Sequence, residues 1–188
     1  MKNQFPERKT IRLAKQNYSS PGAYFITICT HNRERTLSEI VGAGSSRPYK
    51  PNVHLLPAGK IVNDVILDMH KKYSDLSVDY YVVMPNHVHL LLSKNGRFGR
   101  EDPAPTVGNN VSVGGREDPA PTNIIDAVAW FKFITTKKIN ELNGEQRQVI
   151  WQRSFYDHII RNDEDYYESA RYIEENPLRW ERDELYLK

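Results

Sequence analysis

The sequence contains a single cysteine, Cys29, among 188 residues. One thiol cannot form a disulfide within the chain, nor can it supply the several thiolates of a structural zinc site. Long apolar runs are also absent, and the longest stretches, such as Val88–Leu92, are far too short to cross a bilayer. No charged segment followed by an apolar one opens the chain, so we expect a cytoplasmic protein. A glycine-rich phosphate-binding loop is missing as well, which argues against chemistry driven by ATP.

Neither sign of charge predominates in the whole chain, but the basic residues are unevenly distributed along it. The net charge is only +2. Basic residues nevertheless dominate the first seventeen positions, where only Glu7 opposes them, and a second basic group falls in a predicted helix. This pattern suits local contacts with phosphates, although a solvated basic arm is an equal alternative. The residues are Lys2, Arg8, Lys9, Arg12 and Lys15 in the arm, and Lys132, Lys137 and Lys138 in the helix.

The chain length is typical of one domain, and local patterns predict alternating strands and helices. We therefore treat residues 1–188 as a single domain with a basic arm (1–18). The predicted order is strand, helix, strand, strand, helix, strand, helix, which is the ferredoxin-like split βαβ plan, an α+β fold with a central antiparallel sheet and an added C-terminal helix. The ranges are Tyr24–Thr30, Pro57 to about Tyr73, Leu76–Met84, His87–Ser93, Asn123 to Asn143, Val149–Ile160, and Asn162 or Asp163 to about Asn176, where Pro177 ends the helix.

An identical octapeptide, GREDPAPT, occurs at Gly99–Thr106 and again at Gly115–Thr122. Two prolines per copy and no apolar periodicity prevent these repeats from adding a buried layer. We expect a flexible surface loop at about residues 95–122, because added length costs little in such a place.

Two histidines stand two residues apart in a predicted strand, so both side chains leave the same face while Val88 faces the core. His87 and His89 could therefore converge on one cation, or they could simply be polar positions of an alternating strand. The leucines that follow indicate a central, buried strand. Burying an imidazole costs free energy unless it finds a partner, and this cost favours a metal role for the two histidines. With oxygen donors completing the shell, Mg²⁺ or Mn²⁺ fits best, and zinc stays an alternative.

Tyr172 and Asn176 are four residues apart in YIEENP and share one face of the last predicted helix. A phenol there could attack phosphorus, while the Asn176 amide oxygen could bind a metal. A core tyrosine and a helix-terminal asparagine are the alternatives. Tyr156 competes as a nucleophile, because it lies beside Asp157 and His158.

An aromatic and an arginine in the preceding segment, Trp151 and Arg153, could stack on and bond to bases of a single strand. Trp151 could equally belong to the core.

Three motifs together resemble the REP-associated tyrosine transposases, domesticated relatives of the single-tyrosine transposases of insertion sequences within the His-hydrophobic-His nucleases. They are PNHVHLL at Pro85–Leu91, WQRSFYDHII at Trp151–Ile160 and YIEENP at Tyr172–Pro177. The stretch SSPGAYFITICTHNRE resembles the first strand of that family. The resemblance covers nearly the whole chain, except the region of Pro48 and the repeats.

This resemblance implies that His87 and His89 bind a divalent metal, that Tyr172 is the nucleophile, and that Asn176 is a further ligand where insertion-sequence relatives have glutamine. The implied reaction is cleavage and rejoining of single-stranded DNA through a 5′-phosphotyrosine. Its substrates would resemble hairpins of repeated extragenic palindromes flanked by a tetranucleotide. Candidate DNA contacts are Arg8, Lys9, Arg12, Lys132, Trp151 and Arg153.

Two other functions stay open at this point: a DNA-binding regulator that no longer cleaves, and a metal hydrolase that uses water. A monomer is favoured over a dimer, because Tyr172 could reach His87 and His89 within one chain if its helix packs on the sheet.

Overall fold

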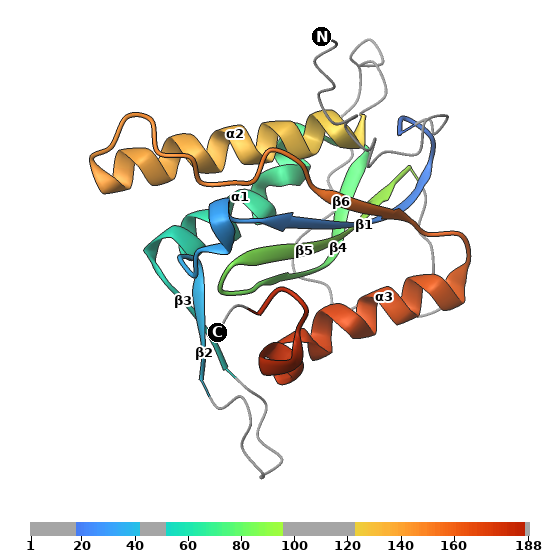
Figure 1. The fold of residues 1–188 in the computed structure, drawn as a ribbon. Coiled ribbons are helices and arrows are strands. Elements are labelled where there is room, and N and C mark those ends of the chain that lie inside the picture. Colours follow the sequence, from blue (N-terminus) through green and yellow to red (C-terminus); the bar gives the residue numbers. More distant parts are fainter. Residues whose placement is uncertain (1–17, 42–51, 96–122, 187–188) are drawn as a thin grey trace, which may run out of the picture.

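A computed structural model describes residues 18–41, 52–95 and 123–186 of the chain. Its centre is a four-stranded antiparallel sheet in the order β4-β5-β1-β6 (Figure 1). The strands are β1 (Gly22–Cys29), β4 (Leu76–Val83), β5 (His87–Lys94) and β6 (Tyr156–Ile159). Together with the helices this confirms the predicted α+β fold with its ferredoxin-like strand order.

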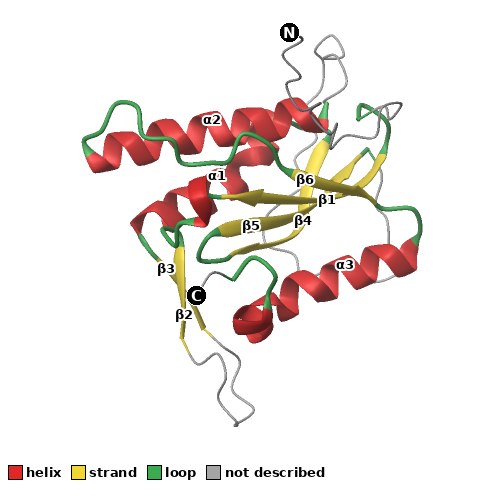
Figure 2. Cartoon of the chain, in the orientation of Figure 1, coloured by secondary structure: helices red, strands yellow, loops and turns green. Residues whose placement is uncertain are grey.

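Helices cover both faces of the sheet (Figure 2). Helix α1 (Pro57–Lys72) and helix α2 (Ile124–Asn143) pack together on one face, and α3 (Asp163–Glu175) packs against β4 and β5 on the other. Asn123 caps α2 as predicted, with its side chain accepting from the backbone N–H of Ile125 at 2.9 Å. The basic arm and the repeat-bearing loop lie outside the described residues.

The alternation along β1 and β5 divides the core into two parts. Ile26 and Ile28 of β1 and Val88 and Leu90 of β5 face α1 and α2. Phe25 and the other intervening residues face α3, together with side chains of that helix. Because cross-strand neighbours share a face, the sheet places His87 and His89 on the α3 side.

Four details differ from the predictions. A second, two-stranded sheet pairs β2 (Ser38–Val41) with β3 (Asn52–Leu55), where only a polar stretch was expected. The fourth strand is confined to β6, because Trp151 forms an isolated bridge with Thr30 and turns into the core. The 3-10 helix η1 (His31–Arg33) was also not foreseen.

The fourth difference lies after α3. The α-helix ends at Glu175, as predicted for a helix followed by Pro177, but the chain then continues as the 3-10 segment η2 (Asn176–Arg182), which was not foreseen. Proline is tolerated there because the N–H groups in the first turn of a helix have no acceptor within the helix, so the N–H that proline lacks costs no hydrogen bond. None of the helices in the described ranges combines the length and apolar character that a bilayer crossing requires.

A glycine fixes how α1 meets the β2 strand. A Cβ on Gly59 would stand 1.9 Å from the carbonyl oxygen of Leu37, so no side chain fits. The contact lets the N–H of Leu56 bond to the same carbonyl at 2.9 Å at the start of α1. This end of the sheet carries the turn before His87, since the N–H of Leu37 also bonds to the carbonyl oxygen of Pro85 at 3.0 Å.

Candidate active site

His87 and His89 are buried side by side on β5. Their exposed fractions are 0% and 2%, and their ring centroids are 4.5 Å apart. Strand alternation turns both rings toward α3 and leaves Val88 in the opposite core, as the sequence predicts. The backbone therefore brings two imidazoles together without any special turn.

Each imidazole is held through its Nδ1 atom. His87 Nδ1 lies 2.8 Å from Asn86 Oδ1, and the amide nitrogen of Asn86 donates to the carbonyl oxygen of Leu185 at 2.8 Å. Since Asn86 thus turns its oxygen to the ring, His87 Nδ1 carries the proton. His89 Nδ1 lies 2.8 Å from the hydroxyl of Thr27, its cross-strand neighbour on β1. A bond on Nδ1 of this kind leaves Nε2 as the ring atom that could bind a metal.

The two Nε2 atoms are buried and bond to no described residue. Burial lowers the pKa of His87 to about 4, although the nearby carboxylate of Asp183 acts in the opposite direction. Burial and the neighbouring His87 also lower the pKa of His89 well below its usual value. Both rings are therefore neutral at pH 7, which is the form that binds metals.

Asn176 adds its amide oxygen to the two Nε2 atoms as a third buried atom that bonds to no described residue. Its amide nitrogen donates to Asp183 Oδ2 at 2.9 Å, and its Oδ1 atom is buried and bonds to no described residue. The Asn176 side chain also lies close enough to His87 and Tyr172 to influence the pKa of both. The asparagine one turn after the tyrosine thus reaches the histidine pair.

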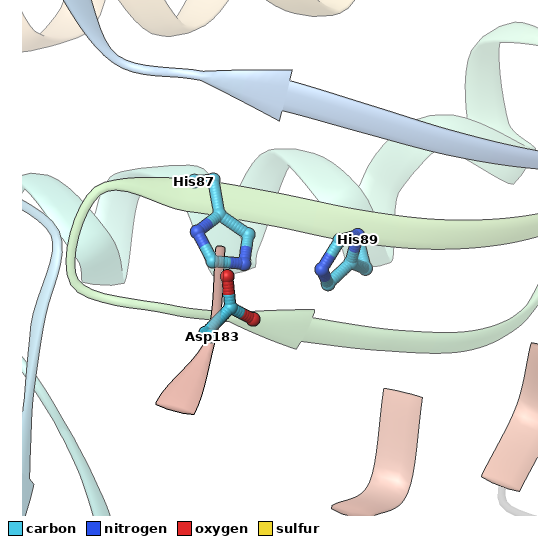
Figure 3. A group of neighbouring side chains, drawn as sticks. All are labelled: His87, His89 and Asp183. Carbon is cyan, nitrogen blue, oxygen red and sulfur yellow. The ribbon is translucent and has the colours of Figure 1, made fainter. Parts of the chain in front are cut away.

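Asp183 was not foreseen from the sequence. One carboxylate oxygen and one nitrogen of each of His87 and His89 all lie within 4.8 Å of one another (Figure 3). The carboxylate is fixed by Asn176 and by the backbone N–H of Leu185, which donates to Asp183 Oδ1 at 2.6 Å. It follows η2 in a run of alternating charges, and no periodicity there distinguishes it from a solvated residue.

Tyr172 lies next to this cluster in the same chain. Its ring meets the His89 ring edge-on at 5.2 Å and the Phe25 ring at 5.9 Å. The side chain is 43% exposed and lines an open groove of about 790 Å³ that also contains His89 and Asp183. Burial, and secondarily Asp183, raises the pKa of Tyr172, while the contact with Asn176 lowers it. The phenol is therefore protonated at neutral pH, and a phenolate here needs added positive charge.

The competing tyrosine, Tyr156, lines the same groove from β6 and is 56% exposed. It pairs across the sheet with Thr27, which separates it from His89 by one strand. Among the described tyrosines, Tyr172 is the one whose ring contacts His89.

The expected DNA contacts fall in three places. Arg8, Lys9 and Arg12 lie outside the described residues. Trp151 is 4% exposed and its indole N–H donates to the hydroxyl of Thr135 at 2.8 Å, so it belongs to the core and offers no stacking face.

The other two expected contacts lie on the surface. Lys132 donates to the carbonyl oxygens of Gln152 and Arg153 at 2.6 and 2.9 Å, and Arg153 is exposed. Both line a second groove of about 440 Å³ together with Phe133 and Arg147, and none of the described residues that line it is acidic.

No protein-family model matches the chain. An uncharacterized protein of Haemophilus influenzae is 30% identical over 189 residues, covering 96% of this chain and 93% of that protein. Among solved structures, a REP-associated tyrosine transposase bound to a REP hairpin aligns with a TM-score of 0.53 and 17% identity, covering 90% of this chain and 74% of that one. The structural likeness confirms the fold that the sequence motifs imply.

Proposed function

We propose a function for this chain, which belongs to the same family as the Haemophilus influenzae protein and has the fold of a REP-associated tyrosine transposase. In this proposal the protein is a metal-dependent single-strand DNA endonuclease and strand transferase. It acts in the cytoplasm through a 5′-phosphotyrosine. One observation carries this proposal: the Tyr172 ring contacts His89, one of two adjacent buried histidines whose Nε2 atoms bond to no described residue. A nucleophile beside side-chain atoms that can bind a cation is the arrangement that metal-assisted phosphodiester cleavage requires.

The side chains fit a divalent cation. His87 and His89 offer Nε2 lone pairs, Asn176 offers a buried amide oxygen, and Asp183 offers a carboxylate that neutralises part of the charge. Two nitrogens with oxygens beside a groove suit Mg²⁺ or Mn²⁺. When bound, such an ion polarises a phosphoryl oxygen and stabilises developing negative charge. The asparagine and the two histidines are the ligands that the family resemblance assigns, and Asp183 is added from its position.

In the cleavage step the oxygen of Tyr172 forms a bond to phosphorus and loses its proton. The bond from phosphorus to the 3′ oxygen breaks, and that oxygen takes a proton, which leaves a 5′-phosphotyrosine and a free 3′-hydroxyl. Attack by a 3′-hydroxyl on the same phosphorus later releases Tyr172 and joins the strands. The phosphodiester energy is kept in the covalent bond, so no nucleotide cofactor is needed.

The substrate is hairpin DNA with a single-stranded flank, by likeness to the transposase that binds a REP hairpin. Lys132 and Arg153, with Arg147 beside them, line a groove whose described lining residues include no acid, and this groove suits the phosphate backbone. Tyr172 and the histidines belong to one chain, so each protomer cuts with its own tyrosine and a monomer is competent.

A labelled single-stranded hairpin DNA incubated with the full-length protein and Mn²⁺ or Mg²⁺ tests the proposal on a denaturing gel. We expect a covalent adduct that disappears in Tyr172→Phe. Tyr167→Phe, which alters a tyrosine of α3 outside the groove, is the matched control and keeps the adduct. Loss of the adduct in Tyr156→Phe but not in Tyr172→Phe would move the nucleophile to Tyr156. Cleavage without an adduct indicates a hydrolase, and binding without cleavage indicates a regulator.

A further inference from the structure

The groove that contains Tyr172 has a second wall that the proposed cleavage does not use. Tyr156 and His158 line it from β6, and Asp165 and Glu168 line it from α3. Phe25 of β1 is the cross-strand partner of His158 and also contacts the Tyr172 ring. The second wall is therefore continuous with the site of the nucleophile.

Helical spacing sets the distance between this wall and the nucleophile. Asp165, Glu168 and Tyr172 stand at positions i, i+3 and i+7 of α3 and share one face. The rise of an α-helix separates Glu168 from Tyr172 by about 6 Å along the axis, and Asp165 from Tyr172 by about 10 Å. A nucleotide joined to a phosphate at Tyr172 reaches this wall.

The charges on the groove disfavour phosphate at this wall. Asp165 and Glu168 line it, and Asp183 and Glu184 line the same groove, whereas Arg33 is the only lysine or arginine among the described lining residues. A carboxylate repels a phosphate but accepts a hydrogen bond from an exocyclic amino group of a base. The wall thus suits a nucleobase rather than the backbone.

Side chains of the wall are arranged to hold a flat ring. Tyr156 is 56% exposed, so its ring is available for stacking. The ring of His158 is fixed by Asp165, whose two oxygens lie 2.8 and 3.0 Å from His158 Nε2. Asp165 is fixed in turn by the N–H of Arg161 at 3.0 Å. Glu168 is exposed on the turn between Asp165 and Tyr172 and extends the wall with a carboxylate that can accept hydrogen bonds.

We propose that this wall binds one unstacked nucleobase next to the scissile phosphate, with Tyr156 stacked on its face and Glu168 accepting from its exocyclic amino group. Adenine, cytosine and guanine carry such a group and thymine does not. The site selects against thymine at one position of the single-stranded flank. This inference rests on the proposed function, because it takes single-stranded DNA as the ligand.

Selection from a pool tests it without cleavage. The probe is a hairpin DNA with a randomised single-stranded flank, retained by the Tyr172→Phe variant and sequenced. We expect thymine to be depleted about tenfold at one position, the effect of one base-reading hydrogen bond. Adding Glu168→Gln abolishes that depletion, because the amide both donates and accepts. Glu174→Gln removes the same charge from another face of α3 and keeps the depletion.

Stacking is tested at the same position with an abasic nucleotide. The abasic DNA binds the Tyr172→Phe variant about tenfold more weakly than the intact DNA, and adding Tyr156→Ala removes this difference. Unchanged base preference in Glu168→Gln, together with an undiminished abasic effect in Tyr156→Ala, overturns the base site alone. If wild-type protein neither binds nor cuts the hairpin pool, the proposed function fails and the base site falls with it.

Discussion

Acid should destabilise the metal-free protein through its buried histidine pair. Burial holds the pKa of His87 at about 4, whereas an unfolded chain gives a histidine its ordinary value of 6.5. Between these two values the unfolded state binds more protons than the folded state. The stability from the neutral ring is therefore complete above about pH 6.5 and is lost as the pH falls toward 4.

The size of this loss follows from the two pKa values. At about pH 5, proton uptake by unfolded His87 costs the folded state about 2 kcal/mol relative to pH 7.5. His89 adds to the loss in the same direction, because its pKa also lies well below the ordinary value. A loss of about 2 kcal/mol is a large part of the stability of a domain this size.

Urea unfolding with a chelator present, at pH 7.5 and at pH 5, measures the effect. His87→Gln removes one of the two titrating rings. Its free energy of unfolding should therefore fall by about 2 kcal/mol less than that of wild type between these pH values. His70→Gln, which alters an exposed histidine of α1, is the control and should match wild type. Mn²⁺ without the chelator should raise the free energy of unfolding at pH 7.5 above that of the metal-free protein, since a ligand that binds only the folded state stabilises it. Equal losses in wild type and His87→Gln would refute the reasoning.

Two further outcomes concern the metal and the assembly. Asp183→Asn should weaken Mn²⁺ binding, measured by calorimetry, by about tenfold or more, because the substitution removes a negative charge beside both histidines and disturbs the partner of Asn176; an unchanged affinity would exclude Asp183 from the site. Mixing Tyr172→Phe with His87→Ala should not restore the covalent adduct on a gel, because each chain holds one broken site; recovery of the adduct would show that protomers exchange their tyrosines.

Strong periodicity explains what could be predicted. A run of β-branched and aromatic residues marks β1, and apolar residues at helical spacing mark α1 and α2, because each of these helices buries a continuous face. The two-residue repeat of a strand predicts that His87 and His89 share a side. The spacing of Tyr172 and Asn176 predicts their common face, although Asn176 opens η2 rather than closing α3.

Weak or non-local signals explain the rest. Strands β2 and β3 have four residues each, and a polar segment separates them, so no local pattern marks their pairing. Asp183 approaches the histidines only because the chain folds back after η2, which depends on tertiary contacts such as Asn86 with Leu185. Trp151 had two equal interpretations, and only the position of Thr135 decides for the core.

Helix α3 acts as a rigid spacer between Glu168 and Tyr172. One residue inserted between them would turn the earlier part of the helix by about 100° relative to the later part and carry Asp165 and Glu168 out of the groove. A two-turn insertion of about seven residues would restore the face but lengthen the separation by about 10 Å. Homologues that read a base with the same wall should therefore keep the length of the helix between these two residues and differ there by substitution alone.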